Sequence, residues 1–187
     1  ETLEYISNYS LYAYEEELKN GYITIPGGNR IGICGKAVTD LEGVRTIKNI
    51  SFINIRMAHE VVGCTDIYME KMYERNELCH TLIISPPCAG KTTFLRDMIR
   101  NISNGFASHK GICVGVVDER SEIAACSGGI PQNQIGIRTD VLDCCPKAHG
   151  MLMLIRSMAP KVIAVDEIGK KEDVGALEYC INCGCKI

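Results

Sequence analysis

Residues 82–93 read LIISPPCAGKTT, and this stretch decides how the rest of the chain is interpreted. The final GKT follows an apolar run and is typical of a phosphate-binding loop, usually written G-x-x-x-x-G-K-[ST]. Ser85 stands where the first glycine of that pattern belongs, and two prolines follow it. The stretch is therefore an intact nucleotide site, a decayed one or a chance match.

A phosphate loop works because successive backbone N–H groups turn inward at a helix N-terminus, where the dipole favours an anion. Pro86 lies upstream of the N–H groups that must face the phosphates, and prolines keep the preceding residues extended. The lysine of such a loop reaches the β and γ phosphates and the next hydroxyl binds Mg²⁺. The predicted ATP-binding residues are Pro87, Cys88, Ala89, Gly90, Lys91, Thr92 and Thr93.

The surroundings of the loop argue against a chance match. A buried strand is expected over HTLIIS, residues 80–85, and an amphipathic helix over KTTFLRDMIRNISNG, residues 91–105. VIAVDE then ends in acids, and Asp166 lies 75 residues after Lys91 (166 − 91). An acid at the end of an apolar strand is typical of a Mg²⁺-holding position. Thr92 and Asp166 are therefore the predicted Mg²⁺ ligands.

Hydrolysis needs a carboxylate that orients and polarises the attacking water. Glu167, directly after Asp166, is the first candidate. Glu119 in VVDERSE is the second, although a solvated turn with a weak local ion pair would also explain it. Charge on the γ-phosphate usually calls for an arginine. Spacing alone does not choose among the candidates, which are Arg45, Arg56, Arg120, Arg138 and Arg156.

Strands alternate with helices from residue 81 onward, with strands expected over 111–119 and 161–167 and helices over about 146–158 and 172–182. This alternation predicts an α/β domain with a mainly parallel sheet. The predicted α/β domain covers residues 81–187. Its final GCKI resembles the beginning of another strand, so we expect that the C-terminal part of this domain is missing.

Residues 1–60 are expected to form a small α+β domain. LYAYEEEL, residues 11–18, favours a helix, and strands flank the turn at Pro26 to Asn29. Residues 61–80 are expected to be a connector with a short amphipathic helix.

Composition excludes several classes of protein. The 187 residues carry a net charge of −3, with no basic stripe for nucleic acid. The apolar runs are shorter than the ~20 residues that span a bilayer. The eleven cysteines are expected to be free, buried thiols. CINCGC, residues 180–185, has metal-ligand spacing but no second pair, so packing is the preferred interpretation.

Four segments together carry a family resemblance: SNYSLYAYEEELKNGYITIPGGNRIGICGKAV near the N-terminus, VVDERSEI, GIPQNQIGIRTDVLD and MLIRSMAPKVIAVDEIG. With the loop, they make the whole chain resemble the stage III sporulation protein AA family of spore-forming bacteria. That family is similar to the ATPases of type II and type IV secretion and of pilus retraction. Asp166 departs from those relatives, which often carry glycine there.

The resemblance implies a RecA-like P-loop ATPase core preceded by a small N-terminal domain, with ATP and Mg²⁺ as ligands. It implies a ring, expected to be a hexamer, in the mother-cell cytoplasm, docked on membrane proteins of a channel between mother cell and forespore. In such rings the nucleotide lies between two subunits, which favours Arg56 and Arg45 as arginines acting in trans. The connector 61–80 would then be the hinge.

Two other functions stay open. One is a nucleic-acid-associated RecA-like ATPase, against which the net charge argues. The other is a scaffold that binds nucleotide without hydrolysing it, against which Lys91, Thr92, Asp166 and Glu167 argue.

Overall fold

The computed structural model describes residues 5, 14–41 and 43–187. The chain divides into two compact units. One comprises Glu1–His59 with Ala125–Gln132, and the other comprises Glu60–Ala124 with Asn133–Ile187. Residues 61–80, which we expected to be a separate connector, thus cluster with the second unit.

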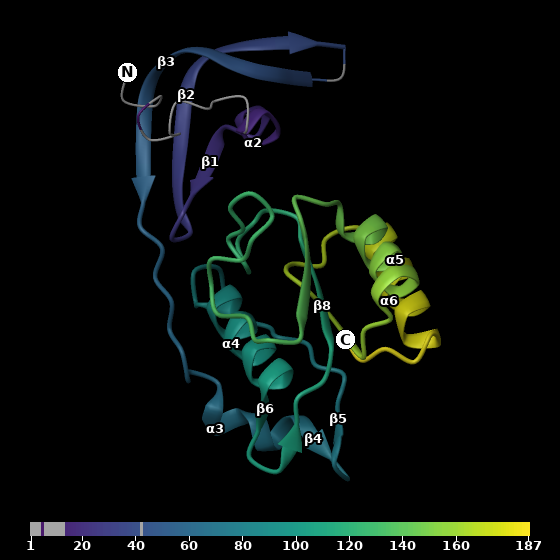
Figure 1. Ribbon diagram of the computed structural model, residues 1–187. Coiled ribbons are helices and arrows are strands. Elements are labelled where there is room, and N and C mark those ends of the chain that lie inside the picture. Colours follow the sequence, from purple (N-terminus) through teal and green to yellow (C-terminus); the bar gives the residue numbers. More distant parts are fainter. Residues whose placement is uncertain (1–4, 6–13, 42) are drawn as a thin grey trace. The chain divides into compact units, whose positions relative to one another are not determined.

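The first unit is built on an antiparallel three-stranded sheet in the order β1-β2-β3 (Figure 1). Its elements are α2 (Glu15–Lys19), β1 (Tyr22–Ile25), β2 (Asn29–Asp40) and β3 (Gly43–Arg56). The predicted strands around the turn at Pro26 are present. Most of the predicted helix over residues 11–18 lies outside the described residues, and the described helix begins at Glu15. A small apolar core holds the unit together, made of Leu18, Ile23, Ile31 and Ile33.

The second unit has a parallel sheet in the order β10-β8-β9, as the alternation of strands and helices predicts. The strands are β8 (Val114–Asp118), β9 (Thr139–Asp143) and β10 (Val162–Val165), and the main helices are α4 (Lys91–Asn104), α5 (Lys147–Met158) and α6 (Lys171–Asn182). Helix α4 lies on one side of β8, and α5 and α6 lie on the other (Figure 1). Strand β9 was not predicted.

The core of the second unit lies between the sheet and the pair α5 and α6. It contains Val117, Met151, Leu154, Ile163, Ala176, Cys180 and Cys185. Cys180 is fully buried, and burial, with neighbouring thiols, raises its pKa to about 11. Two of the three thiols of CINCGC thus pack in the core, as their preferred interpretation holds. Among the described residues, no group of three or more histidine, cysteine or acidic side chains is placed to hold a metal.

The prediction of a buried strand over residues 80–85 is wrong. Residues 79–86 have no regular structure, and Leu82 and Ile84 are 69% and 83% exposed. A strand needs backbone partners, and here the N–H of Thr81 donates to the carbonyl of Ile187 at 2.8 Å. Beyond that bond, the segment and β10 line a common cavity. Lys186 forms a parallel bridge with Val162, so GCKI does begin a pairing beside β10.

Short elements occupy residues 61–80 and the segment after α4. They are α3 (Asp66–Met69), the 3-10 helix η2 (Glu70–Met72), the hairpin β4 (Tyr73–Glu74) and β5 (Glu77–Leu78), and the hairpin β6 (Gly105–Phe106) and β7 (His109–Lys110). The amphipathic helix expected in the connector is therefore a single turn with a 3-10 extension. No helix in the described part of the chain combines the length and apolarity needed to cross a membrane.

Candidate nucleotide site

The loop before α4 has the geometry of an anion cradle. Residues 86–90 are exposed, and α4 begins at Lys91, directly after Gly90. Gly90 has φ +89°, a left-handed conformation that suits glycine, and a Cβ added there would meet nothing within 4 Å. Cys88 is also left-handed, with φ +61°. Because the first N–H groups of a helix have no acceptors within it, this end of α4 can bind phosphate oxygens.

Lys91 folds back over the start of the loop. Its Nζ donates to the carbonyl oxygens of Ser85 at 3.4 Å and Pro86 at 3.2 Å. The two residues that first suggested damage to the loop thus supply the acceptors that hold the lysine. A second cavity, of about 400 Å³, adjoins the loop and is lined by Ala89, Gly90, Lys91, Thr93 and Phe94 among others.

Thr92 and Asp166 meet at the foot of the loop. The Thr92 hydroxyl, in the first turn of α4, donates to Oδ2 of Asp166 at 2.9 Å. Asp166 directly follows β10, so the sheet positions it. A hydroxyl and a carboxylate are hard oxygen ligands, the set that Mg²⁺ takes together with water and substrate phosphates. The two residues therefore fit the predicted metal.

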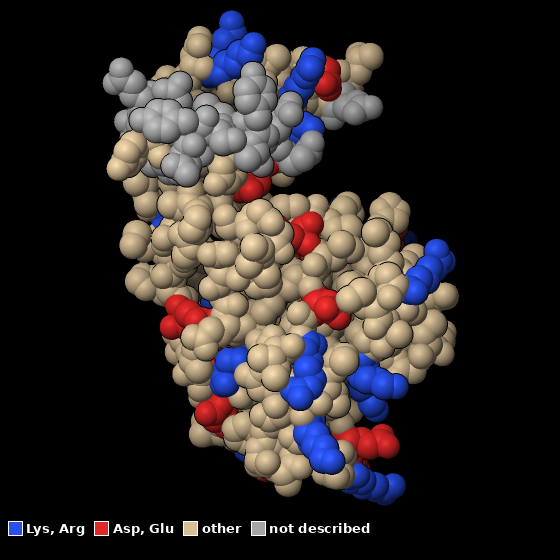
Figure 2. Space-filling model, in the orientation of Figure 1, with Lys and Arg blue, Asp and Glu red and all other residues tan. Residues whose placement is uncertain are grey.

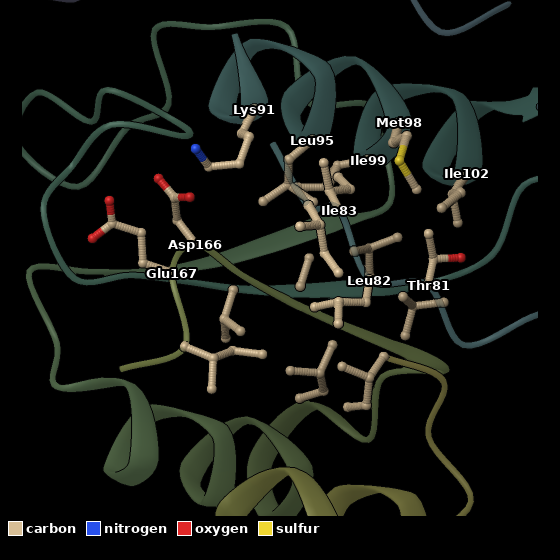
Figure 3. A pocket seen from close by; sticks show the side chains of 18 of the residues that line it. Thr81, Leu82, Ile83, Lys91, Leu95, Met98, Ile99, Ile102, Asp166 and Glu167 are labelled. Carbon is tan, nitrogen blue, oxygen red and sulfur yellow. The ribbon is translucent and has the colours of Figure 1, made fainter. Parts of the chain in front are cut away.

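Glu167 lies next to these groups. Figure 3 shows Lys91, Asp166 and Glu167 at one end of a cavity of about 510 Å³. The rest of that cavity is apolar, with Leu95, Met98, Ile99 and Ile102 of α4 along one side. Glu167 has φ +47°, an uncommon conformation for a non-glycine residue. Its carboxylate pairs with Arg120 at 3.1 Å.

Glu119, the second candidate acid, has a different partner. It follows β8, and Nζ of Lys147 in the first turn of α5 donates to its Oε2. Its side chain is 33% exposed, against 56% for Glu167. The sheet thus places both acids at the ends of adjacent strands, but only Glu167 lines the cavity shared with Lys91 and Asp166.

Asp118 builds the turn after β8. Its buried carboxylate accepts backbone N–H groups from Glu122, Ile123 and Ala124 at 2.8–2.9 Å. Burial raises the pKa of Asp118, although the bonds from Ala124, Glu122 and Ile123 oppose this. From α4, the half-buried Arg96 donates to the carbonyls of Glu122 and Ile123 at 2.6 and 2.7 Å. No sequence pattern indicates this role of Arg96, because the role depends on how the turn closes.

Four of the five candidate arginines fall into two groups, and the fifth, Arg120, pairs with Glu167. Arg138 bonds to Ser103 near the C-terminal end of α4, with its guanidinium on the Ser103 carbonyl at 3.1 Å. Arg156 is in the last turn of α5. Within one chain, Arg138 therefore lies beside the C-terminal end of α4 and Arg156 lies at the C-terminal end of α5, whereas Lys91 and Lys147 lie at the N-terminal ends of these helices. Arg45 and Arg56 are exposed on β3 of the first unit. A role for any of the four stays a prediction.

Comparison with known proteins identifies the family. The model of the family described as "Sporulation stage III, protein AA" matches residues 1–187. The chain belongs to this family. It is 49% identical over 185 residues to stage III sporulation protein AA of Bacillus subtilis, covering 99% of this chain and 60% of that protein. The resemblance drawn from the motifs is therefore confirmed at the level of the family.

Two further matches are more distant. An uncharacterized protein, ycf45, of Cyanidium caldarium is 31% identical over 123 residues, covering 65% of this chain and 34% of that protein. The X-ray structure of the ATPase DotB of Legionella pneumophila matches with a TM-score of 0.51 at 18% identity, over 82% of this chain and 40% of that one. That match shows the fold: an α/β nucleotide-binding type with a parallel sheet. The chain thus spans 60% of the length of its Bacillus subtilis relative and 34% and 40% of the two more distant matches.

Proposed function

We propose that this protein binds ATP with Mg²⁺ at the loop 87–93 and hydrolyses it. The hydrogen bond between Thr92 and Asp166 carries the proposal, because it brings a loop hydroxyl and a strand-end carboxylate together at the N-terminus of α4. Lys91 lies beside them, and its amino group is held by carbonyls that phosphate oxygens can replace. The fold shared with an ATPase supports the proposal.

In this site, each residue has one task. The N–H groups at the start of α4 and Lys91 bind the phosphates, and Thr92 and Asp166 hold Mg²⁺. When bound, Mg²⁺ neutralises charge on the β and γ phosphates. Glu167 orients a water for attack on the γ-phosphorus and takes its proton, while the bond to the β-phosphate oxygen breaks and ADP leaves. Glu119 is the alternative acid, but only Glu167 lines the cavity that also holds Lys91 and Asp166, which favours Glu167 in this role.

We further propose that the protein acts as a ring-forming motor subunit in sporulation, in the mother-cell cytoplasm. Family membership supports the sporulation role. The motifs shared with secretion and pilus-retraction ATPases support a hexamer that docks on membrane proteins of a channel complex. An arginine from a neighbouring subunit, with Arg56 and Arg45 first, would then complete each site.

Nucleic acid is not an expected partner. On the face that Figure 2 shows, basic side chains lie singly or in small groups, with acidic and uncharged residues between them. The net charge of −3 points the same way. Stimulation of ATP hydrolysis by DNA at moderate salt would reverse this expectation.

One set of measurements tests the proposal. Phosphate release from ATP is followed with the protein expressed at the length of its Bacillus subtilis relative, over a range of protein concentrations. We expect Mg²⁺-dependent hydrolysis whose specific activity rises with concentration, since a trans-acting arginine requires assembly. Lys91→Ala should lower ATP affinity and abolish turnover. Hydrolysis that survives Lys91→Ala would contradict the proposed site, and a flat concentration profile would contradict the trans arginine.

A further inference from the structure

Arg120 and Glu167 join the tips of two neighbouring strands. Arg120 follows β8 by two residues and Glu167 follows β10 by two residues, and Val117 of β8 pairs with Val165 of β10. The contact runs from Nη1 of Arg120 to Oε2 of Glu167 at 3.1 Å. It thus links the segment after one strand to the proposed catalytic acid after the next.

This ion pair contributes little to folding stability. The side chains of Arg120 and Glu167 are 62% and 56% exposed, and exposed ion pairs are screened by water and salt. The pair between Lys147 and Glu119 is more enclosed, at 13% and 33% exposure. A stabilising role therefore suits the Lys147 pair better than the Arg120 pair.

The backbone on both sides of the contact is fixed in unusual conformations. The carboxylate of Asp118 and the guanidinium of Arg96 hold the turn that carries Arg120. Ser121, the next residue, has φ +53°, and Glu167 has φ +47°. Left-handed non-glycine residues persist only where the surroundings determine them. The two segments are thus arranged so that the guanidinium meets the carboxylate.

We propose that Arg120 is a positioning residue, which holds the Glu167 carboxylate in the orientation that activates the attacking water. The inference rests on the proposed function. Phosphoryl transfer through a loose transition state demands orientation of the water more than basicity of the acid. The guanidinium engages Oε2 and restrains the carboxylate, and Oε1 is then the oxygen that holds the water.

The test compares kcat and KM for ATP in wild type, Arg120→Gln, Arg120→Lys and a matched control, Arg75→Gln. Arg75 is an exposed arginine in the turn between β4 and β5, and it has no role in the site. A fluorescent ATP analogue gives the nucleotide Kd, and a thermal melt gives Tm. All measurements use the protein at the length of its Bacillus subtilis relative.

We expect Arg120→Gln to lower kcat by about ten- to a hundredfold, the size of effect that follows from a misplaced catalytic group. KM, Kd and Tm should stay at wild-type values, Arg120→Lys should recover part of kcat, and Arg75→Gln should resemble wild type. In a Glu167→Gln background, Arg120→Gln should lower the residual rate no further, because Arg120 acts through that carboxylate.

Two results would overturn the inference while leaving ATP hydrolysis intact. One is an unchanged kcat in Arg120→Gln. The other is a loss that appears equally in Kd or Tm, or that persists in the Glu167→Gln background, because Arg120 would then bind nucleotide or support the fold. A wild-type protein without Mg²⁺-dependent hydrolysis is a different outcome, which would remove the proposed function and this inference with it.

Discussion

The Thr92 hydroxyl donates a hydrogen bond of 2.9 Å to the Asp166 carboxylate, and the two residues lie 74 positions apart in the sequence. The contact joins the first turn of α4 to the end of β10, so the two proposed Mg²⁺ ligands are already brought together by the fold. Ordering of ligand residues in advance lowers the entropic cost of binding.

Replacing the hydroxyl of Thr92 tests its role as a Mg²⁺ ligand. Mg²⁺ should raise the affinity for ATP in the wild type, and we expect this gain to be about tenfold or more smaller in Thr92→Val. Valine keeps the shape of threonine but lacks its oxygen. Thr92→Ser, which keeps the oxygen, should retain most of the gain. Titrations of a fluorescent ATP analogue with Mg²⁺ and with EDTA measure the difference. An equal Mg²⁺ effect in Thr92→Val and wild type would remove Thr92 from the metal site.

The two candidate acids can be separated by matched amide variants. Glu167→Gln should lower kcat by roughly 10²- to 10⁴-fold, the usual contribution of a general base, while leaving nucleotide affinity unchanged. Glu119→Gln should have a smaller effect, because Glu119 does not line the cavity that Lys91, Asp166 and Glu167 share. Phosphate release under saturating ATP gives both rates. The reverse order would make Glu119 the catalytic acid.

The carboxylate of Asp97 predicts how stability depends on pH. Burial by itself raises the pKa of Asp97, but hydrogen bonds from Thr65, Gly63 and Arg100 outweigh this and lower it to about 2. The ionised carboxylate of Asp97 stabilises the folded state. Its contribution to the free energy of unfolding is therefore present above the unfolded-state pKa near 4 and is lost as pH falls towards 2. A fall from 3.8 to about 2 corresponds to about 2 kcal/mol at neutral pH.

Asp97→Asn should therefore lower the free energy of unfolding by about 2 kcal/mol at pH 7 and flatten its dependence between pH 4 and pH 2. The control is Asp66→Asn, whose carboxylate is 47% exposed and should contribute less than about 1 kcal/mol. Urea unfolding at several pH values measures both variants. An unchanged acid limb in Asp97→Asn would show that another group is responsible.

Substitution of two helical glycines by alanine should change stability in opposite directions. A Cβ at Gly150 in α5 would lie 2.4 Å from Cγ1 of the buried Val117, whereas a Cβ at Gly175 in α6 would meet nothing within 4 Å. Gly150→Ala should destabilise the protein by about 1–3 kcal/mol through overpacking. Gly175→Ala should stabilise it by about 0.5–1 kcal/mol through helix propensity. Thermal melts of the two variants give the signs, and a stable Gly150→Ala would mean that α5 can move away from β8.

Local patterns in the sequence predicted the parts of the fold that depend on neighbouring residues. The apolar face and the glycine cap predicted α4, and the apolar run before Asp166 predicted β10. The loop and the strand end also gave Lys91, Thr92 and Asp166 as a group. These signals are complete within a few residues, which is why they can be detected without knowledge of the tertiary structure.

Features that depend on distant partners were not predictable in this way. Residues 81–85 have the composition of a buried strand, but they form no strand and Leu82 and Ile84 are exposed, because a strand requires a backbone partner along its length. Strand β9 has the sequence TDVLD, without alternation of polar and apolar residues, and it is a strand because it pairs with β8. The contact of Arg120 with Glu167 depends on a turn that Asp118 and Arg96 close from different elements.

The hydrogen bonds of Asp97 also have a mechanical consequence. Asp97 lies in the same helix as Lys91 and Thr92, and its carboxylate binds the N–H groups of Gly63 and Thr65 at 2.9 and 2.8 Å. Only a few residues of chain separate Gly63 from the end of the first unit at His59. A displacement of α4 would therefore be transmitted through these two hydrogen bonds to the short segment that leads to the first unit.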